Sequence, residues 1–350
     1  MKQPTETSLC VPGQLRDFSA GTIRWMNPAA LFFAGGDSLY PGILLLILAV
    51  AATPLRQRRW LRTIRNLALW LGLAMAIMAS PPVDWRVEVI FAVIFLSWSF
   101  AGKISRSSRG LRALRFGSAT ALTALLIVLF ASEFLNRRMP TIPAAPTDHL
   151  VVIGDSISAG IGRRTLAWPT VLQQQSEVRV QNLSLPGAGV ADALTMSGRV
   201  GRQDLLVLIE IGGNDLLSGV SSAEFARNLD LLLSRLVTPG RTLVMFELPL
   251  LPHKTGYGIA QRRLSARYGV FLIPKHYFTD VLASADATSD GLHLSDTGAF
   301  KMAALVARVL CPVLKTCDYP KQAWNSVQLS QRSSTRPGAL FPLRRLSRLR

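Results

Sequence analysis

The feature that most constrains this chain of 350 residues is the uneven distribution of its apolar residues, which gather before residue 136. Four apolar segments stand there, each close to the roughly 20 residues that a membrane-spanning helix needs. They are residues 39–55, 67–83, 85–102 and 116–135. A buried helical bundle is the alternative, but a core helix keeps a polar stripe, and residues 43–52 have none. We therefore expect about four transmembrane helices, the third being the least regular because Arg86 and Glu88 stand in its first turn.

Basic residues set the expected orientation. They cluster between the first and second segments and between the third and fourth, namely Arg56, Arg58, Arg59, Arg62, Arg65, Lys103, Arg106, Arg109, Arg112 and Arg115. The positive-inside rule places both of these loops in the cytoplasm, so the termini and the second half of the chain face outward. In a bacterial-type inner membrane this is the periplasmic or extracellular side. The net charge of +18 is then a topology signal beside anionic headgroups, and nucleic acid is not an expected partner.

Composition divides the chain into five regions. We expect an N-terminal segment on the membrane surface, a membrane region, a stiff proline-rich linker, a globular domain, and a basic tail without stable structure. Their bounds are 1–37, 38–136, 137–147, 148–312 and 313–350. Cys311 and Cys317 lie on the expected oxidising side, where a disulfide between them and a buried free Cys311 both remain open.

The globular domain begins with a Val- and Ile-rich run that ends in Gly154-Asp155-Ser156. Such a run suits a buried parallel strand, and Gly154 permits a tight exit that leaves the Ser156 hydroxyl reachable. Asp and Ser are also common helix caps, and this tripeptide alone favours the cap. A nucleophilic serine is indicated only if a base and donors for an oxyanion follow downstream.

Such groups do follow. Asp290-Gly291-Leu292-His293 places a base and an orienting acid in one turn. Gly187 and Asn214 each follow a further strand-like run and can offer a backbone N–H and a side-chain amide. In a doubly wound sheet of order 2-1-3-4-5, sites form at the carboxyl ends of the strands. Ser156, Gly187 and Asn214 would then meet along one edge.

Four motifs together make residues 148–312 resemble the SGNH (GDSL-type) hydrolases, and within them esterases of the thioesterase I/lysophospholipase L1 type. The motifs are Gly154-Asp155-Ser156, Asn182-Leu183-Ser184-Leu185-Pro186-Gly187, Gly212-Gly213-Asn214-Asp215 and Asp290-Gly291-Leu292-His293. The resemblance implies a three-layer α/β/α, flavodoxin-like domain with a five-stranded parallel sheet. It also implies Ser156 as nucleophile, His293 as base and Asp290 as its orienting acid. The implied oxyanion hole consists of Ser156, Gly187 and Asn214.

The strand-like runs are residues 150–153, 178–185, 205–211, 242–248 and 270–274, and helical patterns cover 222–236, 259–268 and 297–310. Three further residue interpretations follow. Asp155 and Asp215 should hold turns by accepting backbone N–H bonds. Trp168 should pack, and His253 should be an exposed loop residue after the fourth strand.

We expect a membrane-anchored serine hydrolase that cleaves carboxylic esters or thioesters through an acyl-enzyme, on a lipid or other acyl ester at the outer face of the membrane. One alternative is an O-acyltransferase or acetylesterase acting on cell-surface polysaccharide. Another is a non-catalytic protein that binds acyl or glycan groups. A membrane region that moves a lipid is a third, but the spans lack an ionisable residue in their middle, so an anchor is simpler.

No cofactor or metal is expected. The four histidines, at positions 149, 253, 276 and 293, show no metal-ligand spacing, and no glycine-rich phosphate loop follows a strand. The expected partners are an acyl ester, thioester or lysophospholipid-like substrate and the membrane lipids.

Overall fold

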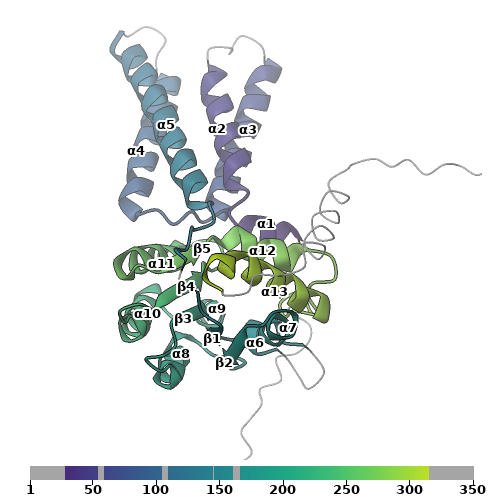
Figure 1. Ribbon diagram of the computed structural model, residues 1–350. Helices are drawn as coiled ribbons and strands as arrows, with labels where there is room; N and C mark the ends of the chain where they lie inside the picture. Colours follow the sequence, from purple (N-terminus) through teal and green to yellow (C-terminus); the bar gives the residue numbers. More distant parts are fainter. Residues whose placement is uncertain (1–27, 54–58, 105–108, 145, 161–165, 315–350) are drawn as a thin grey trace, which may run out of the picture.

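The computed structural model describes residues 28–53, 59–104, 109–144, 146–160 and 166–314. A sheet domain forms one end of the molecule, and two helical hairpins project from it (Figure 1). The expected basic tail and most of the N-terminal segment lie outside these residues. The part of the N-terminal segment that is described contains a short helix, α1 (Pro28–Ala34), which packs against the sheet domain.

The sheet has five parallel strands in the order β2-β1-β3-β4-β5, as the sequence predicted. The strands are β1 (His149–Gly154), β2 (Arg179–Asn182), β3 (Leu206–Glu210), β4 (Thr242–Phe246) and β5 (Phe271–Ile273). β2 is shorter than the predicted run 178–185, and just beyond its end the Asn182 side chain accepts the N–H of Ser184.

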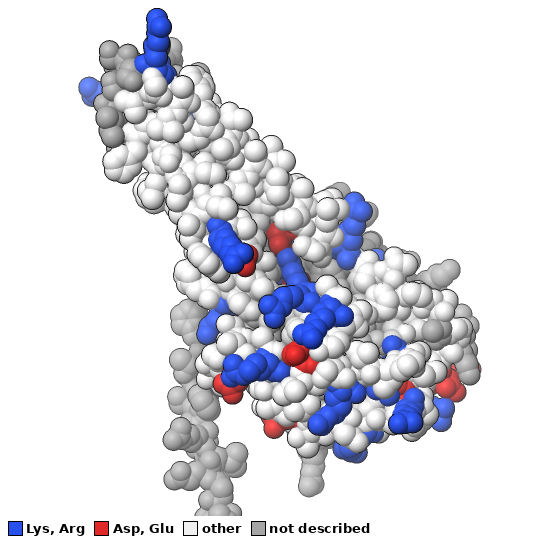
Figure 2. All heavy atoms as spheres, turned by 90° about the vertical axis from the view of Figure 1, so that its left-hand side faces the viewer, with Lys and Arg blue, Asp and Glu red and all other residues white. Residues whose placement is uncertain are grey.

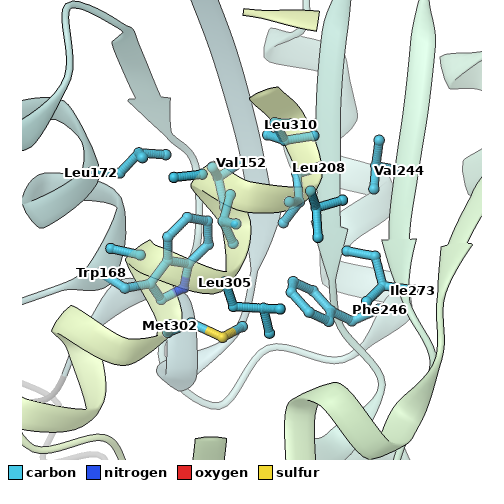
Figure 3. Close-up of a cluster of buried hydrophobic side chains, with 14 of the residues drawn as sticks. Val152, Trp168, Leu172, Leu208, Val244, Phe246, Ile273, Met302, Leu305 and Leu310 are labelled. Atoms are coloured by element: carbon cyan, nitrogen blue, oxygen red, sulfur yellow. The ribbon is translucent and has the colours of Figure 1, made fainter. Parts of the chain in front are cut away.

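Alternate residues of each strand bury against opposite helical layers, as the two-residue period of a strand requires. On one face, Val152, Leu208 and Phe246 belong to a core that includes Trp168 and Met302 (Figure 3). On the other, Val151, Ile209 and Met245 pack under α8, α10 and α11. The domain is therefore a three-layer α/β/α structure, and Trp168 packs in it as predicted.

The helices of the domain are α6 (Ser156–Ala159), α7 (Trp168–Gln175), α8 (Val190–Met196), α9 (Gly213–Ser218), α10 (Ser222–Leu236), α11 (Thr255–Tyr268), α12 (Lys275–Ala283) and α13 (Asp296–Leu310). Three of them, α10, α11 and α13, correspond to the predicted helical patterns. Serine side chains set two of the starts, because Ser221 accepts the N–H of Glu224 and Ser295 accepts the N–H of Gly298. α11 begins at Thr255, four residues before the predicted start.

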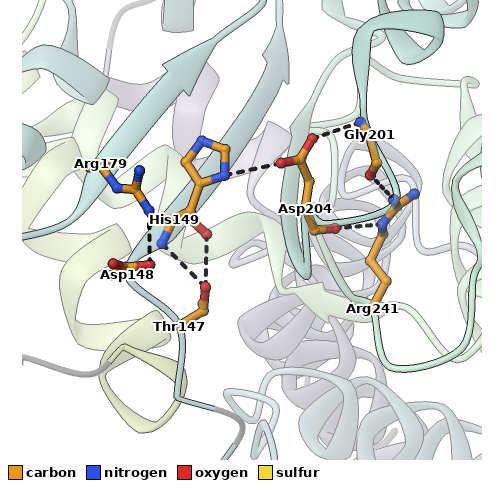
Figure 4. Close-up of polar contacts among 7 residues, drawn as sticks. All are labelled: Thr147, Asp148, His149, Arg179, Gly201, Asp204 and Arg241. Carbon is orange, nitrogen blue, oxygen red and sulfur yellow. Dashed lines mark hydrogen bonds and ion pairs between the residues drawn. The ribbon is translucent and has the colours of Figure 1, made fainter.

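The amino ends of the central strands are held by a network around Arg241 (Figure 4). The Arg241 guanidinium donates to the carbonyl oxygens of Gly201 and, at 2.7 Å, Asp204. The Asp204 carboxylate in turn accepts the N–H of Gly201 at 2.7 Å and lies 3.1 Å from His149 Nδ1. These contacts join the starts of β1, β3 and β4 at the amino edge of the sheet.

The projecting helices agree with the predicted membrane region only in part. They are α2 (Leu39–Ala51), α3 (Arg59–Met78), α4 (Trp85–Ile104) and α5 (Arg109–Asn136). Within the described residues, α3 and α5 are long and apolar enough to cross a membrane, and a third span results if α1 and α2, bent by 73°, count as one. With 13 residues, α2 alone is about 20 Å long, shorter than the roughly 30 Å of a hydrocarbon core. Two or three candidate spans are therefore clear, against the four expected.

The hairpins pair α2 with α3 and α4 with α5. Small residues allow the first pair to approach closely, since a Cβ on Gly72 would stand 2.8 Å from the carbonyl oxygen of Gly42. Outward residues such as Trp70 and Phe116 are 65% and 70% exposed, which suits a lipid environment. Figure 2 shows basic side chains at the far tip, an uncharged surface along the helices, and mixed charges on the domain.

Buried contacts join the helical hairpins to the sheet domain. Arg262 of α11 binds Glu133 of α5 at 2.6 and 3.0 Å and Glu247, which follows β4, at 2.7 Å. Ile142, in the predicted linker, is buried in the domain core, so this segment lies against the domain. Cys311, which follows α13, is disulfide-bonded, which decides against the free thiol that the sequence left open, whereas Cys317 lies outside the described residues.

Candidate active site

Ser156 occupies the tight turn between β1 and α6. Gly154 is required there, because a Cβ at this position would lie 2.7 Å from the side chain of Ser158. Asp155 caps α6 by accepting the N–H of Ile157 at 2.9 Å, as predicted. Ser156 is the first residue of the helix and half-buried, and the first N–H groups of a helix have no acceptor within it. The turn thus presents a hydroxyl and a free N–H on one residue.

Ser156 and Asn214 line one pocket, which we call the active-site pocket, with a volume of about 100 Å³. Its other walls are mainly apolar, and they come from α6, α9, α12, the loop after β4 and the loop before α13. They include Ile157, Leu216, Leu217, Leu248, Leu251, Phe278, Leu282 and Leu292. Ala34 of α1 also lines it, so a segment outside the hydrolase-like region contributes to the wall.

Asn214 is fixed against the loop that carries Gly187. Its amide nitrogen donates to the carbonyl oxygen of Ala188 at 3.0 Å and faces Asp155 Oδ2 at 3.3 Å. Asp215 holds the same loop by accepting the N–H of Val190 at 2.9 Å, which confirms its predicted role. Gly187 is exposed at the turn after β2, with a φ of +78° that favours glycine. Asn214, in the first turn of α9, therefore lies against the loop of Gly187, although Gly187 does not line the active-site pocket.

His293 and Asp290 form a close pair. Asp290 Oδ2 lies 2.6 Å from His293 Nδ1, and Oδ1 accepts the N–H groups of Leu292 at 2.9 Å and His293 at 2.8 Å. Partial burial raises the pKa of Asp290, but these hydrogen bonds outweigh it, and the pKa is lower than usual. Asp290 is therefore ionised at neutral pH and fixes the orientation of the imidazole.

The pair stands beside the serine turn. Leu292 lines the active-site pocket with Ser156, and the charge of His293 acts on Asp155, the neighbour of Ser156. In the described part of the chain the His293 ring makes no hydrogen bond to Ser156 Oγ. Such contacts are often long without substrate and tighten in the reacting complex.

Glu210, at the end of β3, is a buried acid of this region that the sequence analysis did not single out. It is 3% exposed, lines the active-site pocket and accepts the hydroxyl of Ser158 at 2.8 Å. Trp168 Nε1 donates to that same hydroxyl at 3.0 Å. Burial, followed by the charge of Asp155, raises the pKa of Glu210 well above its usual value. In the sequence, Glu210 could have been noticed as a carboxylate at the end of an otherwise apolar strand.

Burial also raises the pKa of Asp155 to about 6, while the N–H of Ile157 and the charge of His293 act in the opposite direction. Two acids with raised pKa values thus lie under the serine turn. Among the residues with described positions, no group of three or more His, Cys, Asp and Glu side chains is placed to hold a metal ion.

Comparison with known proteins matches residues 152–299 to the GDSL-like Lipase/Acylhydrolase family. Esterase TesA of Pseudomonas aeruginosa is 32% identical over 117 residues, which cover 31% of this chain and 58% of that protein. Thioesterase 1/protease 1/lysophospholipase L1 of Escherichia coli is 27% identical over 192 residues, which cover 52% of this chain and 92% of that protein. The match to the first relative thus spans less than two thirds of its length.

Among solved structures, TesA is 26% identical with a TM-score of 0.42, covering 47% of this chain and 99% of that one. The esterase EstA from Pseudoalteromonas is 21% identical with a TM-score of 0.40, covering 51% of this chain and all of that one.

Proposed function

We propose that this chain is a membrane-anchored serine hydrolase of carboxylic esters or thioesters. Residues 152–299 match the GDSL-like lipase/acylhydrolase family. One observation carries the proposal. Ser156 lines an apolar pocket with Asn214, next to the paired Asp290 and His293. A nucleophile, a base with its orienting acid, and an amide donor are the parts that acyl transfer needs.

The roles follow from the contacts. Because Asp290 engages Nδ1 of His293, Nε2 is the nitrogen left to take the proton from Ser156 Oγ. The oxygen attacks the ester carbonyl, and the oxyanion accepts hydrogen bonds from the N–H groups of Ser156 and Gly187 and from the Asn214 amide. His293 then protonates the leaving group. Water repeats the two steps on the acyl-enzyme and regenerates Ser156.

The proposed topology has four spans, α2 to α5, with the hydrolase domain outside a bacterial-type inner membrane. Basic residues support it, because α3 begins at Arg59 and α5 begins at Arg109. These helix ends point away from the sheet domain (Figure 1), so the positive-inside rule places the domain on the opposite side of the membrane. Reaction of single introduced cysteines with a thiol reagent that cannot cross the membrane tests this assignment in whole cells.

The domain then stands directly on the bilayer, since α5 leads into it at Asn136 and Arg262 binds α5. We therefore propose a lipid or other membrane-proximal acyl ester as the substrate. Hydrolysis of lysophospholipid in mixed micelles, compared with acetylated glycan at equal ester concentration, separates these substrate classes.

The central test is hydrolysis of p-nitrophenyl butyrate by the full chain in detergent. Ser156→Ala should lower kcat on the order of 10⁶-fold, as loss of the nucleophile does in other serine hydrolases. The matched control is Ser176→Ala at the end of α7, where the hydroxyl donates to the Leu172 carbonyl oxygen, and it should keep the native rate. Equal rates in the two variants would remove Ser156 from the mechanism.

Two further outcomes would replace the proposal. Acylated sugar as the main product, when a sugar alcohol is added, would make the chain an acyltransferase. Failure of a fluorophosphonate to label Ser156 would favour a binding protein.

A further inference from the structure

A cavity of about 580 Å³ lies between the two hairpins. All four helices α2 to α5 contribute to its walls, and the loop after β4 closes the end next to the sheet domain. The volume falls in the range of about 300–1,000 Å³ that is typical of small-molecule sites. It is distinct from the active-site pocket and shares no lining residue with it.

The lining changes character along the cavity. Leu46, Leu73, Phe95 and Leu125 represent its apolar walls, and Phe91 stacks on Phe95 with ring centroids 5.9 Å apart. Polar groups line only the end near the domain, and they are Ser80, Glu88, His253 and Thr255. A cavity with apolar walls and hydrogen-bonding groups at one end suits a molecule with a hydrocarbon chain and a polar head group.

The polar end is held in a fixed shape. The Ser80 hydroxyl donates to the carbonyl oxygen of Leu251 and accepts the N–H of His253, both at 3.1 Å. Ser80 and His253 have φ values of +44° and +63°, which non-glycine residues rarely adopt. This strained junction connects the two sites, because Leu251 lines the active-site pocket while Ser80 and His253 line the cavity.

We infer that this cavity binds the acyl chain of a membrane phospholipid, with the head of the lipid at Ser80 and His253. The inference rests on the proposed insertion of the hairpins in a bilayer, where lipid tails have direct access to the gap between them. A helix from a second copy of the chain fits poorly. A helix is about 10–12 Å across, so the volume would hold little more than one turn of it. An acyl chain is narrower than a helix and can extend along the length of the cavity.

The test uses the unaltered full chain in phosphatidylcholine vesicles that contain a phosphatidylcholine with a diazirine near the end of one acyl chain. After irradiation, labelled residues are located by mass spectrometry of peptides. Leu129, which lines the cavity, should be labelled at least as strongly as its neighbour Val128, which is 64% exposed on the outside of the same helix and reports contact with the surrounding lipid. Labelling of Val128 without labelling of Leu129 would overturn the inference.

A matched pair of variants gives a second, independent result. Ala92 lines the cavity and Val93, the next residue of α4, is 57% exposed and does not. Ala92→Phe should reduce the labelling of Leu129 several-fold, and Val93→Phe should leave it unchanged. The same decrease in both variants, or peptides crosslinked between two copies at these residues, would contradict a lipid site.

The outcome is separate from that of the proposed hydrolase activity, because the label reports binding and Ser156 takes no part in it. Resistance of the chain to extraction from the vesicles by carbonate is measured on the same sample. Extraction of the chain would refute insertion and with it the lipid site, whereas loss of esterase activity alone would refute only the function of Ser156.

Discussion

Replacing Arg262 by Met should destabilise the chain more than any other exchange of an arginine that we consider. Arg262 makes three hydrogen bonds to two carboxylates, those of Glu133 and Glu247. The side chains of Arg262, Glu133 and Glu247 are 19%, 10% and 3% exposed, respectively. Burial lowers the pKa of Arg262, but the two carboxylates outweigh it and raise the pKa above its usual value, so the guanidinium stays charged.

The magnitude follows from what remains after the substitution. Two buried carboxylates would lose their shared cation, and removing one partner of a buried ion pair costs about 3–5 kcal/mol. Lys275 remains nearby and its backbone N–H still binds Glu247 at 3.2 Å, so we expect the lower part of that range. For a chain with a domain of this size, about 3 kcal/mol corresponds to a decrease in Tm of roughly 6–12 °C.

The assay is thermal unfolding of the full chain in detergent, followed by tryptophan fluorescence. Arg263, the next residue, is exposed, and Arg263→Met should shift the unfolding free energy by no more than about 0.5 kcal/mol. Adding Glu133→Gln and Glu247→Gln to Arg262→Met should restore part of the stability, because the cost arises from uncompensated charge. A Tm of Arg262→Met equal to that of Arg263→Met, or no recovery in the triple variant, would refute the reasoning.

Three further predictions concern the candidate site. Asn214→Ala should lower kcat for p-nitrophenyl butyrate by about 10²–10³ through loss of one oxyanion donor, and a change confined to KM would contradict this role. Burial raises the folded-state pKa of Asp155 to about 6, so its contribution to stability is complete below about pH 4 and is lost as the pH rises through 6. This loss amounts to about 3 kcal/mol, so the Tm of Asp155→Asn should rise relative to that of the unaltered chain between pH 4 and pH 7. A constant difference in Tm across this pH range would contradict the raised pKa of Asp155. Leu251→Ala should widen the active-site pocket and raise kcat/KM for octanoyl relative to butyryl esters by about fourfold per methylene accommodated, and an unchanged ratio would show that Leu251 does not limit the chain.

The parts of the fold that the sequence predicted are those whose signals are local. Helix α10 has the predicted bounds, because Ser221 caps its start and the apolar period continues to Leu236. The strand order followed from short apolar runs that end in polar turns, and the doubly wound arrangement then brought Ser156 and Asn214 to one pocket. In each case a few neighbouring residues determine the outcome.

The parts that were missed depend on contacts between distant residues. The break between α1 and α2 occurs at Gly35 and Gly36, where a Cβ on Gly35 would lie 2.6 Å from Thr279 Oγ1 of α12. Gly36 adopts a φ of +83°, which ends α1 and turns the chain before α2 begins at Leu39. The sequence before residue 38 contains no periodic pattern that indicates the contact with α12. The role of Glu210 likewise depends on Ser158 and Trp168, which reach it from other elements.

These tertiary contacts give segments that precede the sheet domain a part in shaping the candidate active site. Ala34 of α1 lines the active-site pocket, and its carbonyl oxygen accepts the N–H of Leu250 at 3.1 Å. Leu250 is fully buried, and the next residue, Leu251, is bound by Ser80 from the turn between the hairpins. A fragment that starts at the linker would lose both supports of this loop. The shape of the pocket around Ser156, and with it the proposed acyl specificity, therefore depends on segments that contain none of the proposed catalytic residues.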